Sequence, residues 1–120
     1  MIKMNIMKVF TNRLYDRGFI NLLYRGYKKP DIYVLRRHND VITVVQQVVI
    51  DPTSNITSQI EAYFRNIMRN ILQSHSRIIF FEGGGDIKIP DFFRDFCREY
   101  DIEIGIITPD EMNYWLNRIE

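Results

Sequence analysis

The side chains best suited to chemistry are a carboxylate, a pair of amides and a phenol along the middle of the chain. Pro30-Asp31 opens an extended segment, Gln46-Gln47 interrupts a run of valines, and Gln59 and Tyr63 fall in the first turns of a predicted helix. A carboxylate is a hard oxygen ligand for a divalent metal, whereas an amide oxygen can coordinate a metal but adds no negative charge. The chemistry therefore depends on the elements that bring these residues together.

Hydrophobic periodicity predicts those elements. Strand 31–37 would begin at Asp31, and strand 41–50, which is β-branched almost throughout, would carry the two glutamines. The turn residues His38-Asn39-Asp40 between them predict a hairpin. The other predicted elements are helices at 4–17, 56–74 and 90–100, a last helix that opens at Pro109, and strands at 19–27, 77–82 and 102–107.

The order of these elements, α-β-β-β-α-β-α-β-α, predicts an α/β fold with a mixed sheet flanked by helices. The first three strands can form an antiparallel meander, and the later strand–helix–strand passage implies a parallel crossover. The 120 residues favour one domain over 1–120. The predicted helix caps are Gly18 after the first helix, Thr57 or Ser58 with Glu61 before the second, and Thr108 before the last.

Composition excludes several classes of protein. Hydrophobic residues make up 46% and charged residues 26% of the chain, values typical of a globular domain and not of a disordered tail or a collagen-like repeat. The single cysteine, Cys97, allows no internal disulfide and favours a reducing, cytoplasmic setting. No apolar run approaches the ~18 residues of a membrane span. The triple glycine at 83–85 lacks the Lys-Ser/Thr ending of a phosphate loop and is interpreted as a plain loop.

Pro30-Asp31 at a strand start, the polar pair in the next strand and Gln59-x-x-x-Tyr63 in the following helix resemble motifs of the PD-(D/E)XK nuclease superfamily. This superfamily includes restriction endonucleases and archaeal Holliday junction resolvases, and its order of elements is similar over most of the chain. The resemblance implies a restriction endonuclease-like fold and, by analogy with small members, a homodimer. In that family Mg²⁺ or Mn²⁺ is held by the acidic residues, and the motif's lysine helps to position or activate water.

The chain departs from this family at the residues that would catalyse hydrolysis. Where the family has Glu-x-Lys, the chain has Gln46-Gln47-Val48 or Gln47-Val48-Val49, so that an amide replaces the acid and a valine replaces the lysine. Losing both charges would cost several orders of magnitude in rate, at ~1.4 kcal/mol per tenfold. We therefore expect a nucleic-acid-binding protein on a nuclease scaffold, without a catalytic metal or other cofactor.

The distribution of charge supports a nucleic-acid partner, with DNA favoured by the resemblance. Residues 1–37 hold nine basic and two acidic side chains, and residues 80–120 hold four basic and ten acidic ones. The basic segment could track a phosphate backbone, or the two segments could attract each other and leave little external field. The residues expected to bind nucleic acid are Arg25, Lys28, Lys29, Arg36, Arg37, Gln59 and Tyr63; the alternative is that the basic residues form a solvated face and Tyr63 packs on the sheet.

Two other functions stay open. A protein–protein adaptor would use the acidic last third of the chain and exposed aromatic residues such as Tyr114 or Trp115. An active metal-dependent endonuclease or junction resolvase would need relocated ligands, although Asp51 could instead begin a turn and Glu61 complete a helix cap. The candidate catalytic residues of such a nuclease are Asp31, which would also be its metal ligand, with Gln46, Gln47, Asp51, Glu61, Lys28 and Lys29.

Overall fold

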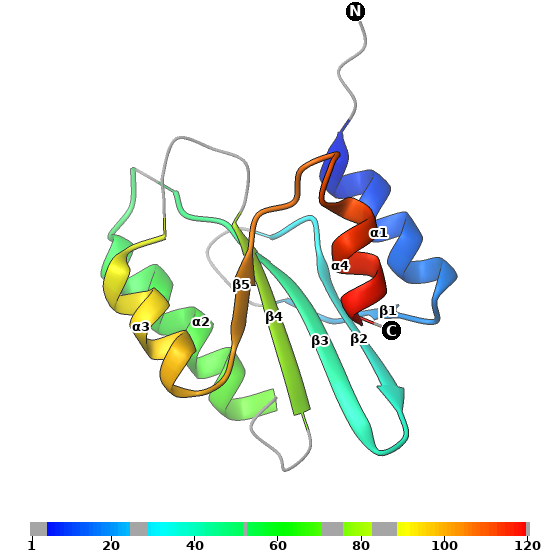
Figure 1. Cartoon of the computed structure of the whole chain (residues 1–120). Coiled ribbons are helices and arrows are strands. Elements are labelled where there is room, and N and C mark those ends of the chain that lie inside the picture. Colours follow the sequence, from blue (N-terminus) through cyan, green and yellow to red (C-terminus); the bar gives the residue numbers. More distant parts are fainter. Residues whose placement is uncertain (1–4, 25–28, 52, 71–75, 83–88, 120) are drawn as a thin grey trace, which may run out of the picture.

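The computed structural model describes residues 5–24, 29–51, 53–70, 76–82 and 89–119. The predicted order of elements is confirmed (Figure 1). The helices are α1 (Ile6–Asp16), α2 (Ile56–Asn70), α3 (Asp91–Glu99) and α4 (Met112–Ile119), and the strands are β1 (Ile20–Asn21), β2 (Tyr33–His38), β3 (Val41–Val48), β4 (Ser76–Glu82) and β5 (Glu103–Gly105).

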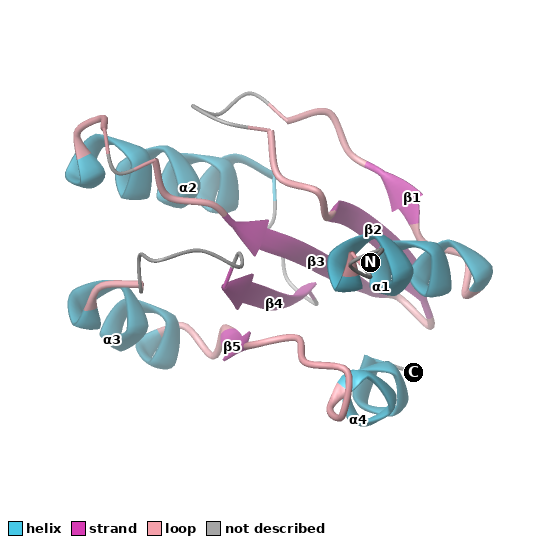
Figure 2. Cartoon of the chain, turned by 90° about the horizontal axis from the view of Figure 1, so that it is seen from above, coloured by secondary structure: helices cyan, strands magenta, loops and turns pink. Residues whose placement is uncertain are grey.

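The five strands form one mixed sheet in the order β1-β2-β3-β4-β5. The first three are antiparallel neighbours, whereas β3, β4 and β5 are parallel, as the sequence predicts. Helices α1 and α4 cover one face, and α2 and α3 cover the other (Figure 2). Because β2 runs against β3, the start of β2 lies at the same edge as the carboxyl ends of β3 and β4. Ligands of open α/β sheets commonly bind at this edge.

Alternation along β3 divides the buried residues into two cores. Val45 packs with Phe10 under α1 and α4, whereas Val44 and Val48 pack with Phe93 under α2 and α3. The β-branched run predicted as the strongest strand is therefore a central strand buried on both faces.

The tight turns confirm two predictions from glycine and turn chemistry. The β2–β3 hairpin is closed by Asn39 and Asp40, both with positive φ, 49° and 66°, as a two-residue turn requires. His38, predicted in the turn, is instead the last residue of β2 and pairs with Val41. Gly18 has φ 87° and follows the end of α1, and its N–H donates to the Tyr15 carbonyl at 3.1 Å. A residue with a Cβ would be strained at this position.

The predicted cap of α2 is wrong. The helix begins at Ile56, and the N–H of Ser58 donates to Asn55 Oδ1 at 3.0 Å, so Asn55 is the capping residue in place of Thr57 or Ser58. Before α4, Thr108 Oγ1 accepts from the N–H of Glu111 at 3.2 Å as a cap would, but the helix begins at Met112 and not at the predicted Pro109, so Thr108 caps the turn that leads into it.

Four strands are shorter than predicted. β2 begins at Tyr33, so Asp31 precedes the strand and does not open it, and β3 ends at Val48 and not at residue 50. In the segment predicted as 19–27, β1 covers only Ile20–Asn21. The N–H of Leu22 still donates to the Tyr33 carbonyl, but the chain then leaves the sheet, and Leu23 is 78% exposed. β5 ends at Gly105 because Ile106 turns outward, while Ile107 joins the core under α1 and α4. The triple glycine at 83–85 lies outside the described residues. No helix in the described part of the chain combines the length and apolar character needed to cross a bilayer.

Candidate nucleic-acid interface

Asp31 and Gln47 meet at the carboxyl edge of the parallel strands. The backbone N–H of Asp31 donates to Gln47 Oε1 at 2.7 Å, and the N–H of Gln47 donates to the Ile32 carbonyl at 2.8 Å. Thr11 of α1 reaches the same point, with its hydroxyl 3.5 Å from the Asp31 carbonyl. The neutral Gln47 amide is therefore fixed to the backbone of Asp31, whose own side chain is exposed.

Gln46 lies on the opposite face of the sheet from Gln47. Its neighbours across the ladder are Tyr33 and Phe80, and it belongs to the side covered by α2 and α3. The side chain is 0% exposed, and among the residues that the structure describes neither its Oε1 nor its Nε2 has a hydrogen-bond partner. Such a group lowers stability by about 1–3 kcal/mol. Of the two registers left open by the sequence, the structure places Gln47 next to Asp31.

Gln59 and Tyr63 bind the backbone that follows β3. Gln59 Oε1 accepts from the N–H of Asp51 at 2.7 Å, and its Nε2 donates to the carbonyl of the same residue at 2.9 Å. The Tyr63 hydroxyl accepts from the N–H of Val49 at 2.7 Å and donates to its carbonyl at 3.0 Å. The two side chains thus satisfy the N–H and carbonyl groups of Val49 and Asp51, as a neighbouring strand would.

This geometry corrects the role expected for Gln59 and Tyr63. The residues are 1% and 2% exposed, so they offer no surface on which a nucleic acid could stack or form hydrogen bonds. Burial also raises the pKa of the Tyr63 phenol above its ordinary value, which keeps the hydroxyl neutral. Both are positioning residues that hold the segment leading into α2.

The residues considered for a relocated metal site do not converge. The Asp51 carboxylate accepts from Thr53 through its N–H at 2.9 Å and its hydroxyl at 2.7 Å, and Glu61 is exposed on α2. Within the described residues, no group of three His, Cys, Asp or Glu side chains is placed to hold a metal ion. Arg25 and Lys28 lie outside the described residues.

Arg36 and Arg37 were predicted together but lie on opposite faces of β2. Arg36 donates to the carbonyls of Arg17 and Ile119, each at 3.1 Å, and its guanidinium sits 4.7 Å from the centre of the Phe19 ring. It therefore bridges the carboxyl ends of α1 and α4, where a cation is favoured by both helix dipoles. Arg37 is exposed, so of this pair it is Arg37 that can reach a ligand.

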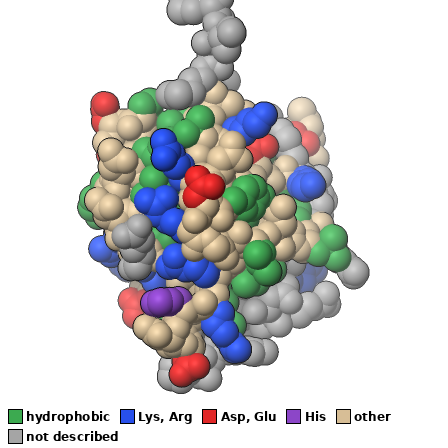
Figure 3. All heavy atoms as spheres, turned by 90° about the vertical axis from the view of Figure 1, so that its right-hand side faces the viewer, with side chains coloured by type: hydrophobic (Ala, Val, Ile, Leu, Met, Phe, Trp, Pro, Cys, Tyr) green, Lys and Arg blue, Asp and Glu red, His purple; other side chains and the backbone are tan. Residues whose placement is uncertain are grey.

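The basic β1–β2 edge and the β5 strand of the acidic segment lie at opposite edges of the sheet, although α4 of that segment packs beside α1. Basic side chains gather on the face formed by α1 and the β1–β2 edge (Figure 3). Exposed members of this basic face are Lys8 and Arg13 on α1 and, at the same edge but on the side of β2 away from α1, Arg37. At the opposite edge, Glu103 of β5 pairs with Arg77 at 3.2 Å and with Arg118, so part of the acidic segment is neutralised locally.

The aromatic residues suggested for an adaptor surface differ in burial. Tyr114 is 57% exposed, as expected, but Trp115 packs against Phe81 with ring centres 4.9 Å apart and is 8% exposed. The prediction of an exposed Trp115 is wrong because α4 turns this side chain toward the sheet.

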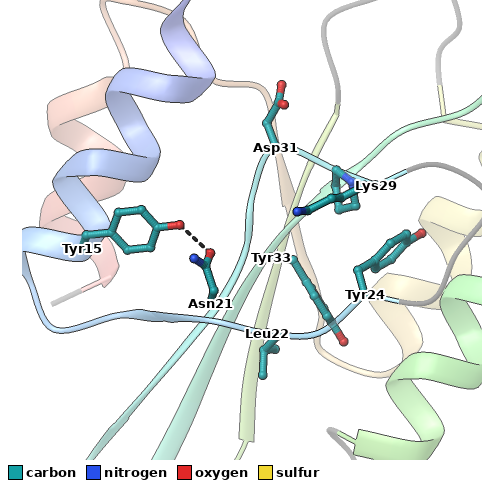
Figure 4. Close-up of a pocket in the computed structure, with 8 residues that line it drawn as sticks. Tyr15, Asn21, Leu22, Tyr24, Lys29, Asp31 and Tyr33 are labelled. Carbon is teal, nitrogen blue, oxygen red and sulfur yellow. Dashed lines mark hydrogen bonds between the residues drawn. The ribbon is translucent and has the colours of Figure 1, made fainter.

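A pocket of about 470 Å³ opens beside Asp31 (Figure 4). Tyr15 and Asn21 line one side, and Tyr24 and Tyr33 line another, with the Lys29 side chain extending between them. We call this the Asp31 pocket. Its volume falls within the roughly 300–1,000 Å³ range of small-molecule sites.

Sequence reasoning identified Asp31 and Lys29 but missed Tyr15, Asn21 and Tyr24. These three come from α1, from β1 and from the segment after it, and their association depends on α1 packing over the sheet edge. One signal was available: Asn21 and Tyr24 are polar or amphipathic residues within an otherwise aliphatic segment. Comparisons of the chain with protein-family models, curated proteins and solved structures gave no match.

Proposed function

We propose that this chain binds nucleic acid through the basic face and does not hydrolyse it. The observation that carries the proposal is the neutral Gln47 amide, which binds the backbone N–H of Asp31 at a strand position where the nucleases that the chain resembles have a second carboxylate. A hard divalent cation is held mainly by anionic oxygens, and one carboxylate with one amide is a weak set of ligands. Without a second carboxylate, the same edge repels phosphate less.

The position of the cations supports a nucleic-acid partner. Lys8 and Arg13 are exposed on the helix that covers Asp31, and Lys29 is exposed at the pocket itself. Exposed cations on one face neutralise phosphates and release counterions, which makes affinity strongly dependent on salt. The partner could be DNA or RNA, and the resemblance to nucleases favours DNA.

Binding is tested by fluorescence anisotropy with labelled single-stranded, duplex and branched DNA from 50 to 200 mM salt. A protein that contacts about three phosphates of duplex DNA should give a slope of log K against log salt of about −2.7. Lys8→Gln and Arg13→Gln should each reduce that slope by about 0.9, whereas Arg98→Gln, which changes an exposed arginine on α3, should not. Absence of salt-dependent binding to every probe would refute the proposal.

Incubation of the same DNAs with Mg²⁺ or Mn²⁺ tests the alternative of an active nuclease. We expect no cleavage. Cleavage that is lost in Asp31→Ala would instead establish a relocated metal site. Light scattering of the free protein tests the homodimer, which is a separate proposal from binding.

A further inference from the structure

We infer that the Asp31 pocket receives an unpaired nucleobase, so that the chain prefers single-stranded over duplex nucleic acid. The inference rests on the proposed function and specifies its ligand. The pocket is large enough for a small planar ligand, and its walls combine aromatic rings with polar groups. Proteins that bind single strands use this combination of a stacking surface and a nearby cation.

Tyr24 supplies the stacking surface. It is half-buried and lines the pocket, and its ring meets that of Tyr33 edge to face, with centres 5.3 Å apart and an interplanar angle of 78°. It also lies near the Tyr63 ring, with centres 6.2 Å apart and an interplanar angle of 41°. The ring is therefore fixed before a ligand arrives, and stacking on it needs little additional ordering.

The polar groups of the pocket suit a base attached to a phosphate backbone. Asn21 is exposed, and its Oδ1 accepts from the Tyr15 hydroxyl, so the amide N–H groups are the part of this side chain that could donate to acceptor atoms of a ligand. Lys29 is exposed and, within the part of the chain that the structure describes, makes no ion pair. Its side chain extends between Asn21 and Tyr33, where an ammonium could meet a phosphate (Figure 4).

The pocket is continuous with the basic face through α1. Tyr15 lines the pocket, and Lys8 lies seven residues earlier on the same side of the helix, about 10 Å along its axis. A strand whose base enters the pocket can therefore place neighbouring phosphates along α1. In a duplex the bases are stacked and paired inside the helix, so they cannot enter without being extruded.

The test compares a labelled single-stranded 12-mer of mixed sequence, the same 12-mer with abasic residues throughout, and its duplex. If one base stacks on Tyr24, the abasic strand should bind about 5- to 150-fold more weakly than the intact one. Quenching of 2-aminopurine fluorescence in the intact strand reports the stacking directly. Equal affinity for the intact and abasic strands, or tighter binding of the duplex, would overturn the inference while leaving salt-dependent binding, and hence the proposed function, in place.

Variants identify the residue responsible. Tyr24→Leu should abolish the difference between intact and abasic strands, whereas Tyr24→Phe should keep it, because the ring and not the hydroxyl stacks. Tyr100→Leu removes an exposed aromatic ring next to α3 and serves as the matched control. Asn21→Ala should lower affinity for the intact strand more than for the abasic one, and it requires no change to the core. Retention of the full difference in Tyr24→Leu would refute the assignment.

A free nucleotide offers the same chemistry as a base in a strand, so a competition experiment separates the two. Deoxycytidine monophosphate should displace the 12-mer only at concentrations far above the affinity of the strand, and Lys8→Gln should weaken the strand but not the mononucleotide. If the mononucleotide binds as tightly as the 12-mer, the pocket is a nucleotide site and the inference fails.

Discussion

The adjacent arginines of β2 have different roles in the structure: Arg36 binds the ends of two helices, and Arg37 is exposed. Substituting them separately tests this difference. Arg36→Gln removes two charge-assisted hydrogen bonds to helix carboxyl ends and a guanidinium packed on Phe19. Arg37→Gln removes the same charge from an exposed side chain on the other face of the strand. The two variants have identical composition, so any difference between them reports position alone.

The expected loss for Arg36→Gln follows from its contacts. Hydrogen bonds from a charged donor contribute about 1.5–3 kcal/mol each, and a cation over an aromatic ring about 0.5–1 kcal/mol. Because Arg36 is half-buried and glutamine retains one donor group, we expect a loss of about 2–4 kcal/mol in the free energy of unfolding. That is a large part of the roughly 5–15 kcal/mol typical of a folded domain, but it leaves a folded protein. Arg37→Gln should change stability by less than about 0.5 kcal/mol.

Urea unfolding followed by circular dichroism measures the loss of stability, and anisotropy with labelled DNA measures the loss of binding. With a urea slope of about 2 kcal/mol per molar, Arg36→Gln should lower the midpoint by about 1–2 M. Arg37→Gln should leave the midpoint unchanged and reduce the salt slope of single-strand binding by about 0.7. If Arg36→Gln keeps the wild-type midpoint and weakens binding as Arg37→Gln does, the assignment of Arg36 to the helix ends is wrong.

Three further results are expected. Tyr63→Phe leaves the N–H and carbonyl of Val49 without their partner, so it should lower the free energy of unfolding by about 1–3 kcal/mol in urea titrations, with unchanged DNA affinity under folded conditions. Gly105→Ala places a Cβ within the indole of Trp115, so it should destabilise by at least about 1–3 kcal/mol, and adding Trp115→Phe should recover part of the loss; no recovery would show that the indole is not the obstacle. Burial raises the pKa of the Cys97 thiol from 9.0 to about 12, so a thiol reagent at pH 8 should label it slowly unless the protein is unfolded. Because the unfolded state releases this proton first, the free energy of unfolding should fall as the pH rises from about 9 toward 12.

The sequence predicts the elements that are determined locally. The β-branched run of β3, the turn at Asn39 and Asp40 and the glycine after α1 each carry their own signal, and each is found where expected. β1 is different, because its length depends on where the chain leaves β2 and not on its own hydrophobicity. Leu23 is aliphatic and was expected in a strand, yet it is exposed beyond the last ladder hydrogen bond.

The candidate site could be predicted only in part because side-chain direction depends on tertiary packing. Alternation along a strand already separates Gln46 from Gln47 and Arg36 from Arg37. It does not say which member of each pair faces α1, since that depends on which face of the sheet α1 covers. Once α1 packs against the Asp31 end, Gln47 lies beside Asp31, and Gln46 is enclosed without a hydrogen-bond partner.

The motif positions that resemble the nuclease family divide according to what the fold requires of them. Gln59 and Tyr63 satisfy backbone groups of residues 49–51, so substituting them would expose the chain to a loss of stability. Gln47 also accepts from a backbone N–H, but an amide and a carboxylate perform that task equally well. The charge of a glutamate at this position would therefore contribute to metal binding and not to the fold. A chain of this fold can accordingly have an amide in place of that carboxylate and keep the hydrogen bond to the Asp31 backbone. Without the negative charge of a glutamate, this edge of the sheet is compatible with a polyanion bound by the neighbouring cations.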